Sequence, residues 1–185
     1  MTLSPRLMRA MNTAAYNHRD HVRKGSDVPY IAHLMAVHHL VAQHTDDEDV
    51  LIAALFHDTL EDVPEHYSEA DMRRDFGDRV TDIVLHLSKN ESHADWQERS
   101  NAYLAHLDNV APDEAVLISC ADKLHNLMSI LEDHATLGDG LWGRFNSGRE
   151  KQEWWYGEVG RVVEKRLPGH PLAQQLRELA ASFPK

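Results

Sequence analysis

Apolar residues recur along this chain mainly at intervals of three and four, which is the spacing of amphipathic helices. No segment alternates with a period of two over the length of a strand, and no internal repeat occurs. We therefore predict an all-α fold, a single domain over residues 1–185 built as a bundle of roughly eight helices. The pattern places helical segments at about residues 5–21, 31–44, 45–63, 69–77, 78–87, 95–109, 113–138 and 148–167, and from residue 171 onward.

Proline, glycine and short polar side chains mark the expected helix ends. Ser4 suits an N-cap and Pro5 a first helical position, while residues 25–29 break the chain before the second helix. Pro64 ends the third helix. A Gly-rich loop is expected from Gly138 to Gly148.

Composition and charge narrow the possible partners. The formal net charge of −11 opposes binding to a nucleic acid polymer, because that affinity comes mostly from Lys and Arg placed against phosphates. A single cysteine, Cys120, cannot form an intrachain disulfide. The N-terminus lacks a signal-peptide pattern, and no apolar run approaches the ~20 residues needed to span a bilayer. We expect a cytoplasmic protein without a membrane partner, whose oligomeric state the sequence does not reveal.

The stretch 55–63 presents one imidazole and three carboxylates directly after an apolar run. On a continuous helix His57 would lie one turn from Glu61. Asp58 would likewise lie one turn from Asp62, so that the four groups form two adjoining rows. Such groups are costly to bury without a counterion, which favours a divalent metal. The alternative is a solvated helix end, since a chain with 14 His contains about one His-Asp pair by chance.

Asp122 is a candidate ligand from a second helix. It lies inside the apolar segment predicted at 113–138, with Ile118 and Asn126 one turn away on either side. An unpaired carboxylate there would be costly. The alternative is a structural role in a cap or an ion pair, and Cys120 nearby is interpreted as a small core residue.

Three motifs occur in the order found in a known family. They are Arg-Lys-Gly and Pro-Tyr-Ile-Ala-His at 23–25 and 29–33, His-Asp-Thr-Leu-Glu-Asp at 57–62, and Ala-Asp-Lys-Leu-His-Asn at 121–126. This arrangement resembles HD-domain metal-dependent phosphohydrolases. More narrowly, it resembles the hydrolase domain of the RelA/SpoT type, which includes stand-alone small alarmone hydrolases that remove the 3′-pyrophosphate of ppGpp. The resemblance covers about residues 10–165.

The resemblance implies an HD-type helical bundle around a metal. Imidazole and carboxylate ligands suit Mn²⁺ or a similar divalent cation. His33 is followed by Leu34 where the family usually has Pro, which should affect only how that helix begins. The implied ligands are His33, His57, Asp58 and Asp122.

The acidic pair after the His-Asp motif has an implied catalytic role. In the resembled family the equivalents of Glu61 and Asp62 orient or deprotonate the attacking water. The alternative is that the two carboxylates merely hold the ligands or the helix end. We express no preference between the two residues as the main base.

Four further residues have implied contacts with the substrate. By resemblance Arg23 packs on a guanine ring, Lys24 assists with the nucleotide, and Asn126 contacts the sugar. Arg144, in the Gly-rich loop, could reach a distal phosphate. The alternative for the cations is ordinary solvation at a helix end or in a loop.

These inferences combine into one expected function with two alternatives. We expect a Mn²⁺-dependent enzyme that hydrolyses ppGpp to GDP and pyrophosphate by means of a water activated by the metal. One alternative is an HD-domain phosphohydrolase acting on a deoxynucleotide, a cyclic nucleotide or NADPH. The other is a catalytically silent regulator that binds a metal or a nucleotide. Neither a synthetase domain nor a regulatory extension fits within 185 residues, so only a hydrolase activity is expected.

Overall fold

The computed structural model of this protein describes residues 3–88 and 95–184, and these form two compact units, residues 1–89 and 90–185. Across the described residues the secondary structure consists of ten α-helices, one 3-10 helix and a single isolated β-bridge. The all-α prediction is therefore confirmed. Because the chain divides into two units, the single domain over 1–185 stays a prediction.

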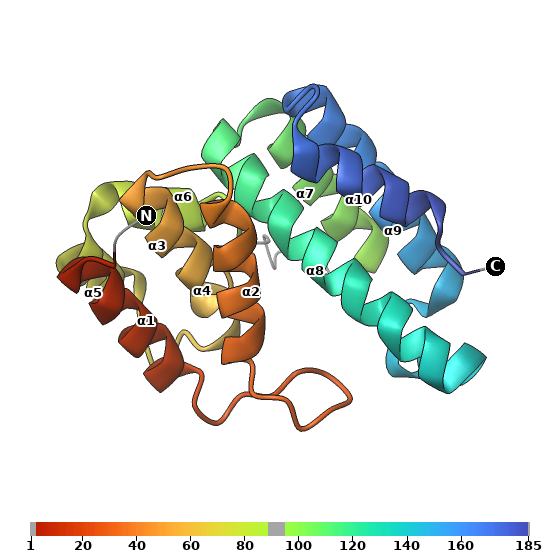
Figure 1. The fold of residues 1–185 in the computed structure, drawn as a ribbon, viewed down its shortest axis with the longest axis horizontal. Helices are drawn as coiled ribbons and strands as arrows, with labels where there is room; N and C mark the ends of the chain where they lie inside the picture. Colours follow the sequence, from red (N-terminus) through yellow and green to blue (C-terminus); the bar gives the residue numbers. More distant parts are fainter. Residues whose placement is uncertain (1–2, 89–94, 185) are drawn as a thin grey trace. The chain divides into compact units, whose positions relative to one another are not determined.

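The first unit is organised around one short apolar helix (Figure 1). All seven residues from Val50 to Phe56 in α3 are buried, and α3 contacts α1, α2 and α6. A helix that is apolar on every face is stable only when neighbours surround it, which explains why this segment lies at the centre. The helices of this unit are α1 (Pro5–Asn17), α2 (Ile31–Ala42), α3 (Glu48–Phe56), α4 (Thr59–Asp62), α5 (Glu69–Phe76) and α6 (Asp78–Leu85).

The connection between α1 and α2 doubles back on itself. Val22 and Pro29 form an antiparallel bridge, and the Tyr30 amide donates to the His21 carbonyl at 2.8 Å. Gly25 has a φ of +78°, a left-handed conformation that glycine adopts without steric cost, and it allows the chain to reverse. Residues 21–30 form this hairpin-like segment, and its last residue, Tyr30, lies at the start of α2.

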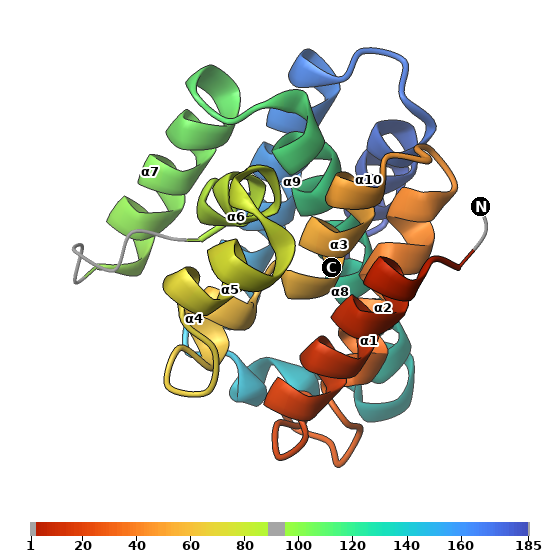
Figure 2. The same cartoon turned by 90° about the vertical axis from the view of Figure 1, so that its left-hand side faces the viewer.

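The second unit is built on the long helix α8, which Figure 2 shows together with α9 and α10. Helix α9 contacts α7, α8 and α10, and its apolar residues from Trp155 to Val163 are buried. Arg166 donates to the Ala111 carbonyl at 2.8 Å and pairs with Asp113 at 2.8 Å, which fixes the start of α8. The elements are α7 (Trp96–Asn109), α8 (Asp113–Leu137), the 3-10 helix η1 (Gly138–Arg144), α9 (Gly148–Arg166) and α10 (Pro171–Ala181).

Three predicted elements differ from the structure, and the first of them is the helix predicted to about residue 21, which ends at Asn17. The segment predicted as one helix over 45–63 is divided into α3 and α4 at His57 and Asp58. The Gly-rich segment predicted as a loop begins with η1, because Leu141 is buried and draws the backbone into tight turns. Among the described residues no helix is both long and apolar enough to cross a membrane.

Candidate metal centre

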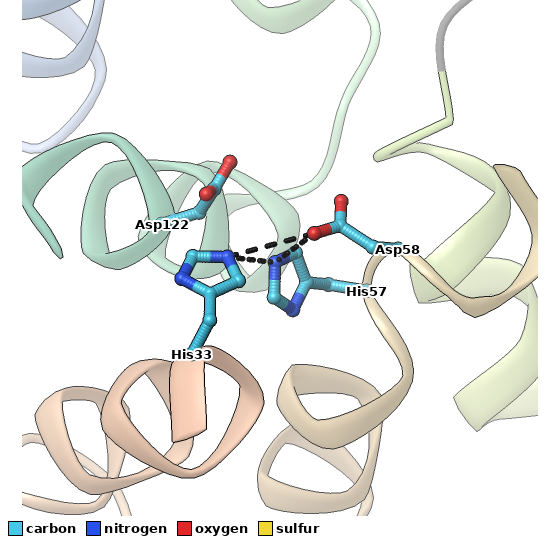
Figure 3. Close-up of side chains that lie close together, drawn as sticks. All are labelled: His33, His57, Asp58 and Asp122. Carbon is cyan, nitrogen blue, oxygen red and sulfur yellow. Dashed lines mark hydrogen bonds and ion pairs between the residues drawn. The ribbon is translucent and has the colours of Figure 1, made fainter. Parts of the chain in front are cut away.

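Two imidazoles and a carboxylate of the first unit converge on one point (Figure 3). The Nε2 atoms of His33 and His57 lie 3.2 Å apart. The Oδ2 atom of Asp58 lies 3.0 Å from the Nε2 of His57 and 3.5 Å from that of His33. Both His side chains are almost fully buried, and that of Asp58 is 23% exposed. The three residues thus present a compact set of nitrogen and oxygen ligand atoms.

The spacing of these ligand atoms can be compared with that around a divalent ion. Bonds of about 2.1 Å at octahedral or tetrahedral angles place neighbouring ligand atoms about 3.0 to 3.4 Å apart. The three observed separations of 3.0, 3.2 and 3.5 Å match this range closely. His33, His57 and Asp58 therefore fit a divalent metal as they stand.

A hydrogen bond within the chain fixes the orientation of His57. Its Nδ1 lies 2.8 Å from the Ala54 carbonyl oxygen, and since a carbonyl only accepts, Nδ1 carries the proton. The Nε2 lone pair is then directed toward His33 and Asp58. Ala54 would otherwise accept from the Asp58 amide in a continued helix, so the imidazole bond also ends α3. The row expected from His57 to Glu61 is wrong for this reason, whereas Asp58 and Asp62 do lie one turn apart, since the Asp62 amide donates to the Asp58 carbonyl at 2.8 Å.

His33 is placed by the beginning of α2. Tyr30 is the N-cap residue of α2, and its carbonyl accepts from the His33 amide at 2.9 Å. This puts the His33 side chain in the first helical turn, where its ring packs edge-on against the rings of Tyr30 and His57. The usual Pro after this histidine is not needed, because Leu34 continues the helix and is fully buried.

Tyr30 also reaches the carboxylate ligand directly. Its hydroxyl donates to Asp58 Oδ2 at 2.6 Å, which is short for a neutral donor and typical of a bond to an ionised acceptor. The Tyr30 ring stacks on His21 at a centroid distance of 4.0 Å and on His18 at 5.3 Å. The two imidazoles, whose own centroids are 5.5 Å apart, thus pack together against the ring of the side chain that contacts Asp58.

The two stacked imidazoles are neutral at pH 7. Burial, followed by the neighbouring His21, lowers the pKa of His18 to about 4. Burial also lowers the pKa of His21. Their Nδ1 atoms lie 3.2 Å apart, and the Nε2 of His18 lies 3.3 Å from the Thr59 hydroxyl. These uncharged rings connect the end of α1 to the start of α4.

The acidic pair, Glu61 and Asp62, lies on the short helix α4, which begins directly after Asp58. The Asp62 side chain is 30% exposed and lies 3.9 Å from His21 Nδ1. Partial burial, the charge of Asp58 and the charge of Glu61 raise the pKa of Asp62 to about 6, although a hydrogen bond from Tyr30 acts in the opposite direction. A carboxylate with this pKa can accept a proton and release it near neutral pH.

Asp122 belongs to the second unit. It is buried on α8, forms an ion pair with the neighbouring Lys123, and accepts a hydrogen bond from the side-chain amide of Asn126. The predicted burial of Asp122 is confirmed. Its contacts with Lys123 and Asn126 fit the alternative of a structural ion pair. Its role as a fourth ligand stays a prediction.

Comparison with known proteins identifies the family. The family described as HD domain matches residues 10–138. The chain belongs to the HD-domain family. This confirms the resemblance drawn from the His33, His57-Asp58 and Asp122 motifs.

Individual relatives of this HD-domain protein are named as enzymes of guanosine polyphosphates. The Drosophila melanogaster guanosine-3′,5′-bis(diphosphate) 3′-pyrophosphohydrolase MESH1 is 33% identical over 132 residues, which are 69% of this chain and 70% of that protein. The GTP pyrophosphokinase of Streptomyces coelicolor is 38% identical over 125 residues, 66% of this chain. The match spans only 14% of that enzyme and 16% of the Haemophilus influenzae 3′-pyrophosphohydrolase.

A solved structure gives the same grouping. It is described as a metazoan ortholog of SpoT that hydrolyses ppGpp, and it superimposes with a TM-score of 0.78 at 27% identity. The alignment covers 98% of this chain and 97% of that one. The RelA/SpoT-type resemblance is thereby confirmed for the HD domain described here.

The predicted substrate residues of this HD domain lie in both units. Arg23 and Lys24 lie at the turn of the hairpin-like segment, with the Arg23 guanidinium 5.8 Å from the centre of the Tyr30 ring. In the second unit Asn126 is bonded to Asp122, and Arg144 of η1 pairs with Asp133 at 3.1 Å. Arg144 therefore has a partner that the sequence did not indicate, and its contact with a distal phosphate stays a prediction.

Sequence reasoning missed several polar residues around the ligands. Tyr30 lies in the motif used for the resemblance, yet a tyrosine before a helix gives no sign of its contact with Asp58. His18 and His21 lie beyond the end of α1 at Asn17, where the sequence pattern still predicted helix. His38 lies in none of the motifs, yet it is buried, and its Nδ1 lies 3.0 Å from the Leu51 carbonyl.

Proposed function

We propose that this chain is a divalent-metal-dependent 3′-pyrophosphohydrolase that converts guanosine 3′,5′-bis(diphosphate) and water to GDP and pyrophosphate. One observation carries the proposal: His33, His57 and Asp58 converge at metal-ligand spacing in an HD domain. The relatives named for this reaction support the choice of substrate. In this proposal the two units act as one catalytic domain over residues 1–185.

The proposed metal ligands are the converging triad and one residue of α8. Asp122 is the fourth ligand, because it is a buried carboxylate in the third motif of the family. Mn²⁺ is the proposed ion, since two imidazoles and two carboxylates form a borderline-to-hard ligand set. When bound, such an ion polarises a phosphoryl oxygen and lowers the pKa of water. The ligands are His33, His57, Asp58 and Asp122.

In this proposal the acidic pair, Glu61 and Asp62, accepts the proton that the attacking water loses. Asp62, with a pKa raised to about 6, is ionised in most molecules at pH 7 and basic enough to accept that proton. Glu61 lies beside it on α4 and adds negative charge to its surroundings. As the water oxygen bonds to phosphorus, the bond to the 3′-oxygen breaks and pyrophosphate departs.

The nucleotide is held by residues of both units in this proposal. Arg23 stacks on the guanine ring and Lys24 neutralises phosphate charge, which suits a cationic turn on an otherwise acidic protein. Asn126 contacts the sugar. Arg144 contacts a distal phosphate, for which it would exchange its bond to Asp133.

The single cysteine, Cys120, suits a reducing compartment. We therefore place this protein in the cytoplasm, with a small nucleotide rather than a membrane or a nucleic acid polymer as its partner. The net charge of −11 supports the exclusion of nucleic acid polymers.

The test is a substrate panel with product identification. The purified protein is loaded with Mn²⁺ and offered ppGpp, GTP, dGTP, cyclic nucleotides and NADPH, and phosphate is distinguished from pyrophosphate. Pyrophosphate and GDP in equal amounts from ppGpp are expected. Turnover of another compound with none of ppGpp would reject the substrate but retain the metal site.

A further inference from the structure

One oxygen atom of Asp58 is shared by three neighbours. Asp58 Oδ2 accepts from the Tyr30 hydroxyl at 2.6 Å and faces the Nε2 atoms of His57 and His33 at 3.0 and 3.5 Å. The carboxylate oxygen that would bind the metal is therefore already oriented by a donor that is not itself a ligand.

The tyrosine that donates this bond is fixed by its own surroundings. Its ring lies nearly parallel to those of His21 and His18, with interplanar angles of 11° and 14°. Its amide donates to the His21 carbonyl, which anchors the backbone across the hairpin-like segment. His18 in turn contacts Thr59, the residue after Asp58. Ring, backbone and carboxylate thus belong to one connected set of contacts.

We infer that Tyr30 is a positioning residue for the metal centre, whose hydroxyl holds the Asp58 carboxylate in the rotamer that places Oδ2 beside His33 and His57. The inference rests on the proposed function, because it assumes that these three residues bind a metal. Without the hydroxyl, Asp58 can rotate, and its 23% exposed side chain can turn toward water. Each metal-binding event would then include the entropic cost of ordering this side chain.

The expected size of the effect follows from other metal sites. Groups that orient ligands without touching the metal change metal affinity by about 10- to 100-fold when they are removed. A tyrosine hydroxyl suits this role because it is neutral at pH 7 and leaves the negative charge of Asp58 available to the cation. Tyr30→Phe removes only the hydroxyl and retains the ring that stacks on His21 and His18.

Tyr67→Phe provides a matched control. Tyr67 is buried in the first unit where Tyr30 is half-buried, and its hydroxyl likewise donates to a carboxylate, Asp75, at 3.1 Å. None of the proposed metal ligands accepts this bond. The Tyr30 hydroxyl also bonds to Asp62, and the Tyr67 hydroxyl also donates to the Asp71 carbonyl at 3.3 Å. A general loss of stability therefore affects both variants, whereas a loss of metal affinity is expected only for Tyr30→Phe.

The experiment measures Mn²⁺ affinity rather than turnover. Free Mn²⁺ is titrated into metal-stripped full-length wild type, Tyr30→Phe and Tyr67→Phe, and binding is followed by electron paramagnetic resonance; the melting temperature of each stripped protein is also recorded. We expect a dissociation constant for Tyr30→Phe that is ~10- to 100-fold higher than that of wild type. Tyr67→Phe should retain the wild-type dissociation constant.

The outcomes separate this inference from the proposed function. If wild type binds Mn²⁺ and hydrolyses ppGpp while Tyr30→Phe binds within two-fold of wild type, the positioning role is rejected and the function stands. If wild type binds no Mn²⁺, both are rejected. Should Tyr30→Phe not fold by circular dichroism, Tyr30→Leu, which also lacks the hydroxyl, takes its place; a dissociation constant within two-fold of wild type in that variant also overturns the inference.

Discussion

The imidazole Nδ1 of His57 donates to the carbonyl oxygen of Ala54, three residues earlier, at 2.8 Å. This bond replaces the backbone bond that would have continued α3, and it fixes the protonated nitrogen of the ring. The same interaction thus ends a helix and directs the Nε2 lone pair toward the other ligands. Because Asp58 follows at the break, its side chain reaches the centre from a different direction than a continuous helix would allow.

Removal of the α8 carboxylate tests the ligand set. Asp122→Ala is expected to weaken Mn²⁺ binding by more than ~100-fold and to abolish measurable ppGpp hydrolysis, since a ligand contributes more than the groups that orient it. Glu132→Ala, which removes an exposed carboxylate from the same helix, should leave both unchanged. An Asp122→Ala protein with stoichiometric Mn²⁺ and full turnover would refute the assignment.

Neutral replacements of the acidic pair separate catalysis from metal binding. Asp62→Asn and Glu61→Gln are each expected to retain Mn²⁺ affinity, and the residue that acts as the main base should lose ~10²–10⁴-fold in kcat. Equal Mn²⁺ affinity with unchanged kcat in both variants would exclude a catalytic role for the pair.

The pH profile of the same reaction gives an independent test of Asp62. Its pKa is raised to about 6, so the form that accepts a proton is lost as the pH falls through this value. We expect kcat to decrease about ten-fold per pH unit below pH 6 and to level off above pH 7. In Asp62→Asn, kcat should no longer decrease below pH 6. If the decrease remains in this variant, another group causes it.

The role of the hairpin turn in nucleotide binding is tested with two arginines. Arg23→Ala is expected to raise the KM for ppGpp about ten-fold without changing Mn²⁺ affinity, because a planar guanidinium stacks on a flat ring. Arg19→Ala, an exposed arginine that pairs with Asp20, should behave as wild type. Equal KM values for the two variants would remove Arg23 from the binding site.

Acid should destabilise the protein through His18. Its pKa is about 4 in the folded protein and 6.5 in the unfolded chain, so between these values the unfolded chain binds more protons. Stability is fully present above pH 6.5 and is lost as the pH falls toward 4, by about 3 kcal/mol at most. Urea unfolding at several pH values should show a shallower decline for His18→Gln; an identical decline would contradict the buried neutral imidazole.

Much of this architecture could be predicted from the sequence. The spacing of apolar residues is sufficient to predict the all-α fold, and the motifs single out His33, His57 and Asp58 together as ligands. The helix break at His57 could not be predicted, because residues 50–62 have the spacing of a continuous helix and the break comes from a side chain competing for the Ala54 carbonyl.

Other features depended on contacts between distant segments. The bond from Tyr30 to Asp58 joins residues 28 positions apart and has no periodic pattern. No sequence pattern marks His38 as buried, but the packing of α2 against α3 buries it and supplies the Leu51 carbonyl as a partner. Arg144 shows the converse case, in which a cation predicted to contact phosphate already has Asp133 as a neighbour.

The bridge between Val22 and Pro29 has a consequence for how ligands influence one another. The bridge and the backbone hydrogen bonds beside it connect the turn that contains Arg23 to the segment that contains Tyr30. A nucleotide that restrains Arg23 would therefore also restrain the hydroxyl bonded to Asp58. By thermodynamic reciprocity, metal and nucleotide would then each raise the affinity of the other by the same factor.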